Sequence, residues 1–220
     1  MTKKLAAAFL LAAASAGAGE TRYSVMDRVT NKRVSLGLTI SGPARQTEID
    51  VYHGDFSAYG FGNYDYALHK ITESDFGFDW TRSFGPVEAS AGWEYISVPY
   101  FEIRNTQDVH GSLAFDLPLR PKIIAYRDFS NVNGTCAQLS ATQDVADLTI
   151  KGEAGYSHEF IRDGSGLSHL SLFVSKSFPF LDGRTVTLEA GGVKSLTNGD
   201  GLYEDGVTFR VRLDGNFSSR

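Results

Sequence analysis

The sequence predicts an all-β fold, an antiparallel up-and-down transmembrane β-barrel of about twelve strands. Three observations support this prediction. Short segments alternate apolar and polar residues along the chain, as strands with one apolar face do. No apolar run of about 18 residues follows the N-terminal region, which excludes an ordinary membrane-spanning helix. Connections between the segments are alternately shorter and longer, as in barrels that cross an outer membrane.

The clearest predicted strand covers residues 207–217. One face carries Val207, Phe209, Val211, Leu213, Gly215 and Phe217, whereas the other carries Thr208, Arg210, Arg212, Asp214 and Asn216. Its length fits a tilted strand that spans a bilayer. Its place near the C-terminus fits the closing strand of a barrel.

The other predicted strands show the same alternation less completely. Ile123 and Ile124 are adjacent apolar residues, Leu139 is the only large aliphatic residue of its segment, and Phe173 breaks an otherwise regular face. An even number of strands is usual in bacterial single-chain barrels. In chain order, the predicted strands cover residues 34–41, 48–51, 56–67, 75–80, 87–95, 112–117, 122–129, 135–143, 148–160, 170–178, 186–191 and 207–217.

The connections fall into two sets when the first strand starts in the periplasm. The periplasmic turns are predicted at 53–55, 85–86, 118–121, 144–147 and 179–184. The external loops are predicted at 42–45, 68–73, 98–106, 130–134, 161–168 and 196–206. The external set is longer on the whole, and a soluble β-sandwich, the alternative fold, would have no reason to show this division.

The first 18 residues predict a cleavable signal peptide, which leaves residues 19–220 as a single barrel domain. Lys3 and Lys4 precede a short apolar stretch from Leu5 to Ala14, and small residues at 14–18 offer cleavage sites. A buried N-terminal helix is the alternative. Together with the barrel pattern, this predicts export to the outer membrane.

Charge and cysteine content narrow the function classes. The formal net charge of −5 argues against nucleic acid as a partner, because phosphate binding needs a basic face. The single Cys136 cannot form an internal disulfide. Aromatic residues on the predicted outward faces fit lipid and lipopolysaccharide as surroundings, and of the charged residues on those faces, Lys176 and Lys194 fall near strand ends.

Four segments also resemble a family, the porin-like small outer-membrane β-barrels of Gram-negative bacteria, which have no assigned function. They are FSAYGFGNYDY, SFGPVEASAGWEY, NTQDVHGSLAFDLPLRPKIIAYRDF and GLSHLSLFVSKSFPF. The resemblance implies a barrel of about twelve strands inserted by the barrel-assembly machinery, and it carries over no catalytic residue. Such barrels usually end on an aromatic residue, whereas Ser218, Ser219 and Arg220 follow Phe217 here.

Two patterns could carry other chemistry. His169-Leu170-Ser171 is an H-x-S arrangement, but the Asn that follows Ser in deacylase-type barrels is absent, and His158 falls on the outward face. We therefore predict no enzymatic activity and no cofactor. Asn198, Asp200, Glu204 and Asp205 could hold Ca²⁺ on a flexible loop, although acidic surface loops are usually only solvated.

The predicted inward faces point to a function. They carry eleven acidic and three basic side chains, and rings of carboxylates favour cations. We predict a narrow, porin-like passive channel with a weak preference for cations among small solutes. The alternative is a non-conducting structural or surface-interaction barrel that acts through its external loops. The predicted lumen-lining residues are Glu48, Asp50, Asp75, Asp79, Glu88, Glu94, Asp116, Lys151, Glu153, Glu159, Glu189, Arg210, Arg212 and Asp214.

Overall fold

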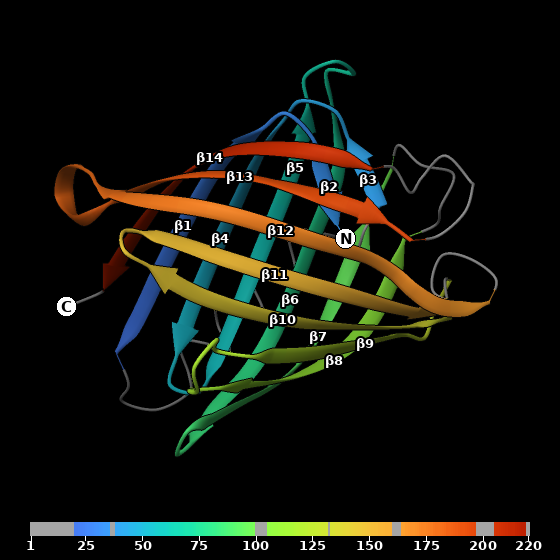
Figure 1. Ribbon diagram of the computed structural model, residues 1–220, viewed down its shortest axis with the longest axis horizontal. Coiled ribbons are helices and arrows are strands. Elements are labelled where there is room, and N and C mark those ends of the chain that lie inside the picture. Colours follow the sequence, from blue (N-terminus) through green and yellow to red (C-terminus); the bar gives the residue numbers. More distant parts are fainter. Residues whose placement is uncertain are drawn as a thin grey trace.

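A computed structural model describes residues 20–35, 38–99, 105–131, 133–159, 164–196 and 205–218. Twelve strands form one closed, all-antiparallel barrel, which confirms the predicted fold class (Figure 1). They are β1 (Thr21–Thr30), β4 (Ala44–His53), β5 (Phe56–Asp65), β6 (Lys70–Phe84), β7 (Val87–Ser97), β8 (Thr106–Phe115), β9 (Lys122–Asp128), β10 (Thr135–Val145), β11 (Leu148–His158), β12 (Ser165–Pro179), β13 (Thr185–Ser195) and β14 (Gly206–Ser218).

The barrel closes between its first and last strands. β1 pairs with β14 from Arg22–Ser218 to Thr30–Arg210, and its other edge pairs with β4. Figure 1 shows β14, in red, running beside β1, in blue. Closure satisfies the backbone groups of every strand edge, which is what a sheet needs in lipid.

The predicted first strand is wrong, although the total of twelve is right. The described residues of this segment belong to a separate two-stranded sheet, β2 (Arg33–Ser35) and β3 (Leu38–Ser41), and the barrel begins with β1 instead. The pattern of β1 is masked because Asp27 interrupts its outward face. Arg45 on β4 compensates that charge, because its Nε and Nη2 donate to the two oxygens of the Asp27 carboxylate at 2.9 and 2.8 Å.

Several strands are longer than the alternation predicted, and two carry register shifts. One shift lies between Asn63 and Tyr64, opposite β6, and the other lies between Gly155 and Tyr156, opposite β12. β6 and β12 therefore extend into the predicted external loops 68–73 and 161–168. β11 ends at His158 instead of residue 160, and the next residue, Glu159, turns the chain with a positive φ of 52°.

The outer face is apolar over most of its area. Large exposed apolar side chains include Phe56, Leu172 and Phe209, all more than half exposed, as lipid contact requires. The two lysines predicted near strand ends each pair with a loop carboxylate, Lys176 with Asp147 and Lys194 with Asp205.

All connections between strands fall at one of two ends. The first strand starts near Arg22 and the last strand finishes near Ser218, and both points lie on the side of the barrel that carries the shorter turns. One of these turns contains the 3₁₀ turn η1 (Leu181–Gly183). In bacterial barrels the short turns face the periplasm. Figure 1 places β2 and β3 toward the opposite end, away from the C-terminus. No described helix is long and apolar enough to cross a membrane.

Candidate functional site

Three cavities lie against the inward faces of the strands. The first, which we call the upper cavity, has a volume of about 330 Å³ and is lined by Glu73 and Asp108, near the β2–β3 hairpin. The lower cavity, of about 380 Å³, extends from the hairpin past Glu48 to Tyr52. The mouth cavity, of about 500 Å³, lies beside the turn at Gly85. The interior is therefore a chain of small chambers, in which neighbouring cavities share lining residues.

The predicted lumen residues can now be placed. Asp75, Glu94, Lys151, Glu153, Glu189 and Arg210 line the upper cavity. Glu48, Asp50, Asp75, Asp79 and Glu94 line the lower cavity. Glu88, Asp116 and Lys151 line the mouth cavity.

Three predicted residues line none of these cavities. Arg212 and Asp214 pair in register with Arg28 and Met26, which line the lower cavity, so they share that inward face. Glu159 is different, because β11 has ended before it and the residue is exposed in a turn. Its prediction as an inward residue extended the strand alternation too far.

The hairpin β2–β3 places a positively charged side chain, that of Arg33, in the lumen, where the sequence did not predict one. Arg33 donates from Nε to Glu73 Oε2 at 3.0 Å and from Nη2 to Glu73 Oε1 at 3.2 Å. Its guanidinium also stacks on the Phe61 ring, 4.9 Å from the centroid. Arg33 lines both the upper and the lower cavity, so it stands where the two chambers meet.

Basic side chains gather on the strands around the closure. Arg28 lies on β1 and Arg210 lies on β14, where its Nη1 donates to Glu189 at 2.7 Å. Arg210 also stacks on Phe173, with its Cζ 4.8 Å from the ring centroid. Phe173 thus breaks the alternation of its strand because it faces the lumen, where it covers Gly191.

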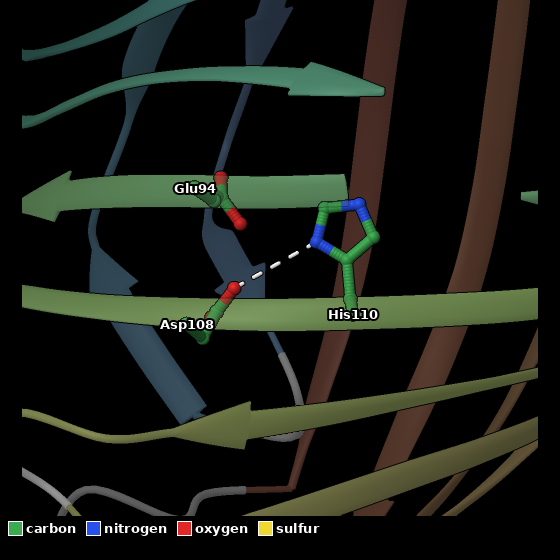
Figure 2. Close-up of side chains that lie close together, drawn as sticks. All are labelled: Glu94, Asp108 and His110. Atoms are coloured by element: carbon green, nitrogen blue, oxygen red, sulfur yellow. Dashed lines mark ion pairs between the residues drawn. The ribbon is translucent and has the colours of Figure 1, made fainter. Parts of the chain in front are cut away.

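Acidic side chains gather on the strands from β4 to β8, where they include a cluster on β7 and β8 with Asp108 buried at its centre. Figure 2 shows Glu94 from β7 and Asp108 and His110 from β8 pointing toward one another. One ligand-type atom from each lies within 4.8 Å of the others. His110 Nε2 lies 2.6 Å from Asp79 Oδ1, and its Nδ1 lies 3.7 Å from Asp108 Oδ1. Asp108 Oδ1 and His110 Nδ1 are buried without a hydrogen-bond partner.

The second buried histidine of the lumen is fully bonded. His169 places Nδ1 at 3.0 Å from Ser168 Oγ and Nε2 at 3.2 Å from Glu153 Oε1. Its ring nitrogens therefore serve Ser168 and Glu153, and not the Ser171 of the H-x-S pattern. His158 lies exposed at the end of β11, bonded to Ser165. His169 thus belongs to a buried hydrogen-bond chain with Ser168 and Glu153.

Sequence reasoning missed the lumen residues Arg28, Arg33, Glu73, Asp108, His110 and His169. Extending the alternation of Ser112 backwards would have found His110 and Asp108. A bulge displaces the register beside Glu73, and nothing in the local pattern could have placed Arg33 in the lumen. Cys136 is a buried free thiol. Of the proposed loop ligands, Asn198, Asp200 and Glu204 lie outside the described residues, and Asp205 pairs with Lys194.

Comparisons with known proteins support the fold. No family model matches this chain, and no curated protein matches it in sequence. Among solved structures, it is similar to the KdgM porin, with a TM-score of 0.57 and 11% identity over 87% of this chain and 97% of that one. The KdgM porin in complex with disordered oligogalacturonate gives 0.59 and 11% over 90% and 99%. An outer-membrane channel from Pseudomonas putida F1 gives 0.52 and 13% over 92% and 97%. The resemblance to porin-like small outer-membrane barrels is thus confirmed at the level of the fold.

Proposed function

We propose that this chain is a narrow passive channel of the outer membrane with a preference for small cations. The observation that carries the proposal is the excess of carboxylates along the interior. Six carboxylates line the upper cavity and three others line the lower one, which gives nine against the four basic residues Arg28, Arg33, Lys151 and Arg210. Carboxylates that line a water-filled path lower the energy of a cation there and raise that of an anion.

The separation of charge across the lumen supports the same proposal. The carboxylates of β4 to β8 face the chambers directly, whereas Arg210 is neutralised by Glu189 and Arg33 by Glu73. A passing cation would therefore meet acidic groups such as Asp75, which has a buried oxygen without a hydrogen-bond partner. An anion would meet Arg33 and Arg210 already paired with carboxylates, and Arg28, which donates to the neutral Gln46. The acidic groups should dominate selectivity as a result.

The size of the chambers sets the class of solute. Volumes of about 330 to 380 Å³, with Arg33 standing between them, suit ions and small neutral solutes. The oligogalacturonate named for the KdgM complex is a chain of acidic sugars. Because carboxylates outnumber basic groups in this lumen, we do not expect such a polyanion to pass here. We assign no enzymatic role to the barrel.

Conductance across a planar bilayer tests the proposal. The full chain, folded into detergent and checked by heat-modifiable gel mobility, should give discrete conductance steps in KCl. Persistent silence of a correctly folded barrel would overturn the channel assignment. It would favour a structural or surface-interaction barrel.

A matched variant separates these two functions. Shortening the predicted external loop 196–206 between β13 and β14 leaves in place every described residue that lines the three cavities. The channel proposal predicts that the conductance steps persist in this variant. Loss of binding to surfaces or partners in a barrel that never conducts would support the other function.

A further inference from the structure

We propose that Glu94, Asp108 and His110 form a binding site for a transition-metal dication inside the lumen. The three side chains come from adjacent strands, since Glu94 of β7 pairs in register with Asp108 of β8, and His110 lies two residues further along the same inward face. Their candidate ligand atoms lie within 4.8 Å of one another. Figure 2 shows the three groups converging on one space.

Two buried atoms of this cluster point to a missing ligand. Asp108 is only 2% exposed and the His110 side chain only 8%, yet Asp108 Oδ1 and His110 Nδ1 have no hydrogen-bond partner. A buried polar atom without a partner costs free energy, so native structures usually satisfy it by protein, water or an ion. The two atoms form an ion pair with each other when His110 is protonated, but the 3.7 Å between them is too long for a hydrogen bond. This separation suits two ligand atoms that bind one ion, since metal–ligand bonds of about 2.0–2.2 Å place neighbouring ligand atoms roughly 3–4 Å apart.

The surroundings of His110 fix its ring for this role. Nε2 lies 2.6 Å from Asp79 Oδ1, so an Nε2–H can donate to this carboxylate, while Nδ1 faces Asp108 and would bind the ion after losing its proton. Metal-binding histidines almost always donate their other N–H to a carboxylate or carbonyl in this way. Tyr59 and Glu94 line the same cavity beside this cluster.

Gly92 makes this arrangement possible. A Cβ at that position would lie 2.2 Å from Asp79 Oδ1 and 2.5 Å from His110 Nε2. A side chain at position 92 would therefore push Asp79 and His110 apart.

The donor set selects the class of ion. One imidazole nitrogen with two carboxylates suits Zn²⁺, Co²⁺, Mn²⁺ or Fe²⁺, whereas Ca²⁺ and Mg²⁺ prefer oxygen ligands alone. The site is reachable from both chambers, because Asp108 lines the upper cavity and His110 lines the lower one. An ion inside the lumen would thus meet it.

Titration with Co²⁺ tests the site directly, because its visible absorption reports the ligands. The full chain in detergent should bind one equivalent saturably, with absorption bands of a low-symmetry nitrogen and oxygen site. Asp108→Asn and His110→Gln should each abolish this saturable binding of Co²⁺. Asp79→Asn should weaken binding by roughly 10- to 100-fold, because it removes the carboxylate that orients the His110 ring.

His169→Gln is the matched control, since it removes the other buried histidine of the lumen, and it should leave the Co²⁺ equivalent unchanged. The proposed site would be overturned if the wild type bound no Co²⁺ saturably. It would also be overturned if Co²⁺ binding survived Asp108→Asn or disappeared with His169→Gln. Heat-modifiable mobility shows that each variant is folded. Binding is measured without conduction, so the outcome is independent of the channel assignment.

Discussion

Two arginines each hold a carboxylate through Nε and Nη2, one pair on the inner face of the barrel and the other on its outer face. Arg33 holds Glu73 inside the lumen, at 18% and 7% side-chain exposure, and Arg45 holds Asp27 outside, at 57% and 34%. The bond lengths are alike, between 2.8 and 3.2 Å. The environment decides what each pair does. The inner pair determines how the hairpin divides the interior, whereas the outer pair removes a net charge from an exposed face.

Breaking the inner clamp should have the largest effect. Loss of one partner of a buried ion pair costs about 3–5 kcal/mol, which is more than an isolated two-stranded hairpin can supply. Arg33→Ala should therefore release β2–β3 from the lumen, raise the single-channel conductance and make the lumen more acidic. Arg45→Ala is the matched control on the outer face, and its conductance should equal that of the wild type. Equal conductance in all three proteins would show that Arg33 does not narrow the path.

Neutralising inner carboxylates should change selectivity without changing the fold. The double variant Asp75→Asn and Glu94→Gln removes two of the carboxylates that line both chambers. The ratio of cation to anion permeability should fall, because the lumen loses negative charge. The outward Asp27→Asn should leave the ratio unchanged. A ratio that responds to Asp27 but not to the inner pair would place the selectivity outside the barrel.

Two glycines sharpen the comparison in terms of stability. Gly92 lies beneath Asp79 and His110, whereas Gly152, on an outward face, has no atom within 4 Å of an added Cβ. Gly92→Ala should destabilise the barrel by about 1–3 kcal/mol, the usual cost of overpacking. Gly152→Ala should leave stability nearly unchanged. Urea unfolding in lipid measures both, and equal midpoints would mean that the inner face can move to admit a methyl group.

The smallest effect is expected at the exposed pair of Lys176 and Asp147. A hydrogen bond from Lys176 lowers the pKa of Asp147 below its ordinary value, and Asp147 is fully exposed in a turn. A lowered folded-state pKa contributes stability above the ordinary carboxylate pKa, and this stability is lost as the pH falls through the lowered value. Solvent screening makes the contribution small. Asp147→Asn should thus barely shift the urea midpoint at neutral pH, and any difference should vanish in acid.

The same inside–outside alternation explains what could be predicted from the sequence. The apolar outer face of β14 is continuous, so its inward Arg210 and Arg212 could be assigned from parity alone. In β1, outward Asp27 hides the pattern, and the compensating Arg45 is close only after folding. The strand was therefore missed and residues 34–41 took its place in the prediction.

The candidate metal site shows a second limit. Glu94 was predicted as inward because Trp93 and Tyr95 flank it with a clear apolar face. Asp108 and His110 were missed because Gly111 leaves a gap in the opposite face of their strand. Arg33 could not be predicted at all, since its position depends on a hairpin folding back onto β5 and β6. Local alternation thus predicts strand faces, but not which residues from different strands meet.

The reversal potential across a KCl gradient tests the central claim most directly. If inner carboxylates control passage, the folded wild-type barrel should reverse at a potential with the sign of K⁺ moving down its gradient. The magnitude should decrease in the Asp75→Asn and Glu94→Gln double variant. A reversal potential with the sign of Cl⁻ would contradict the claim that the acidic wall controls the channel.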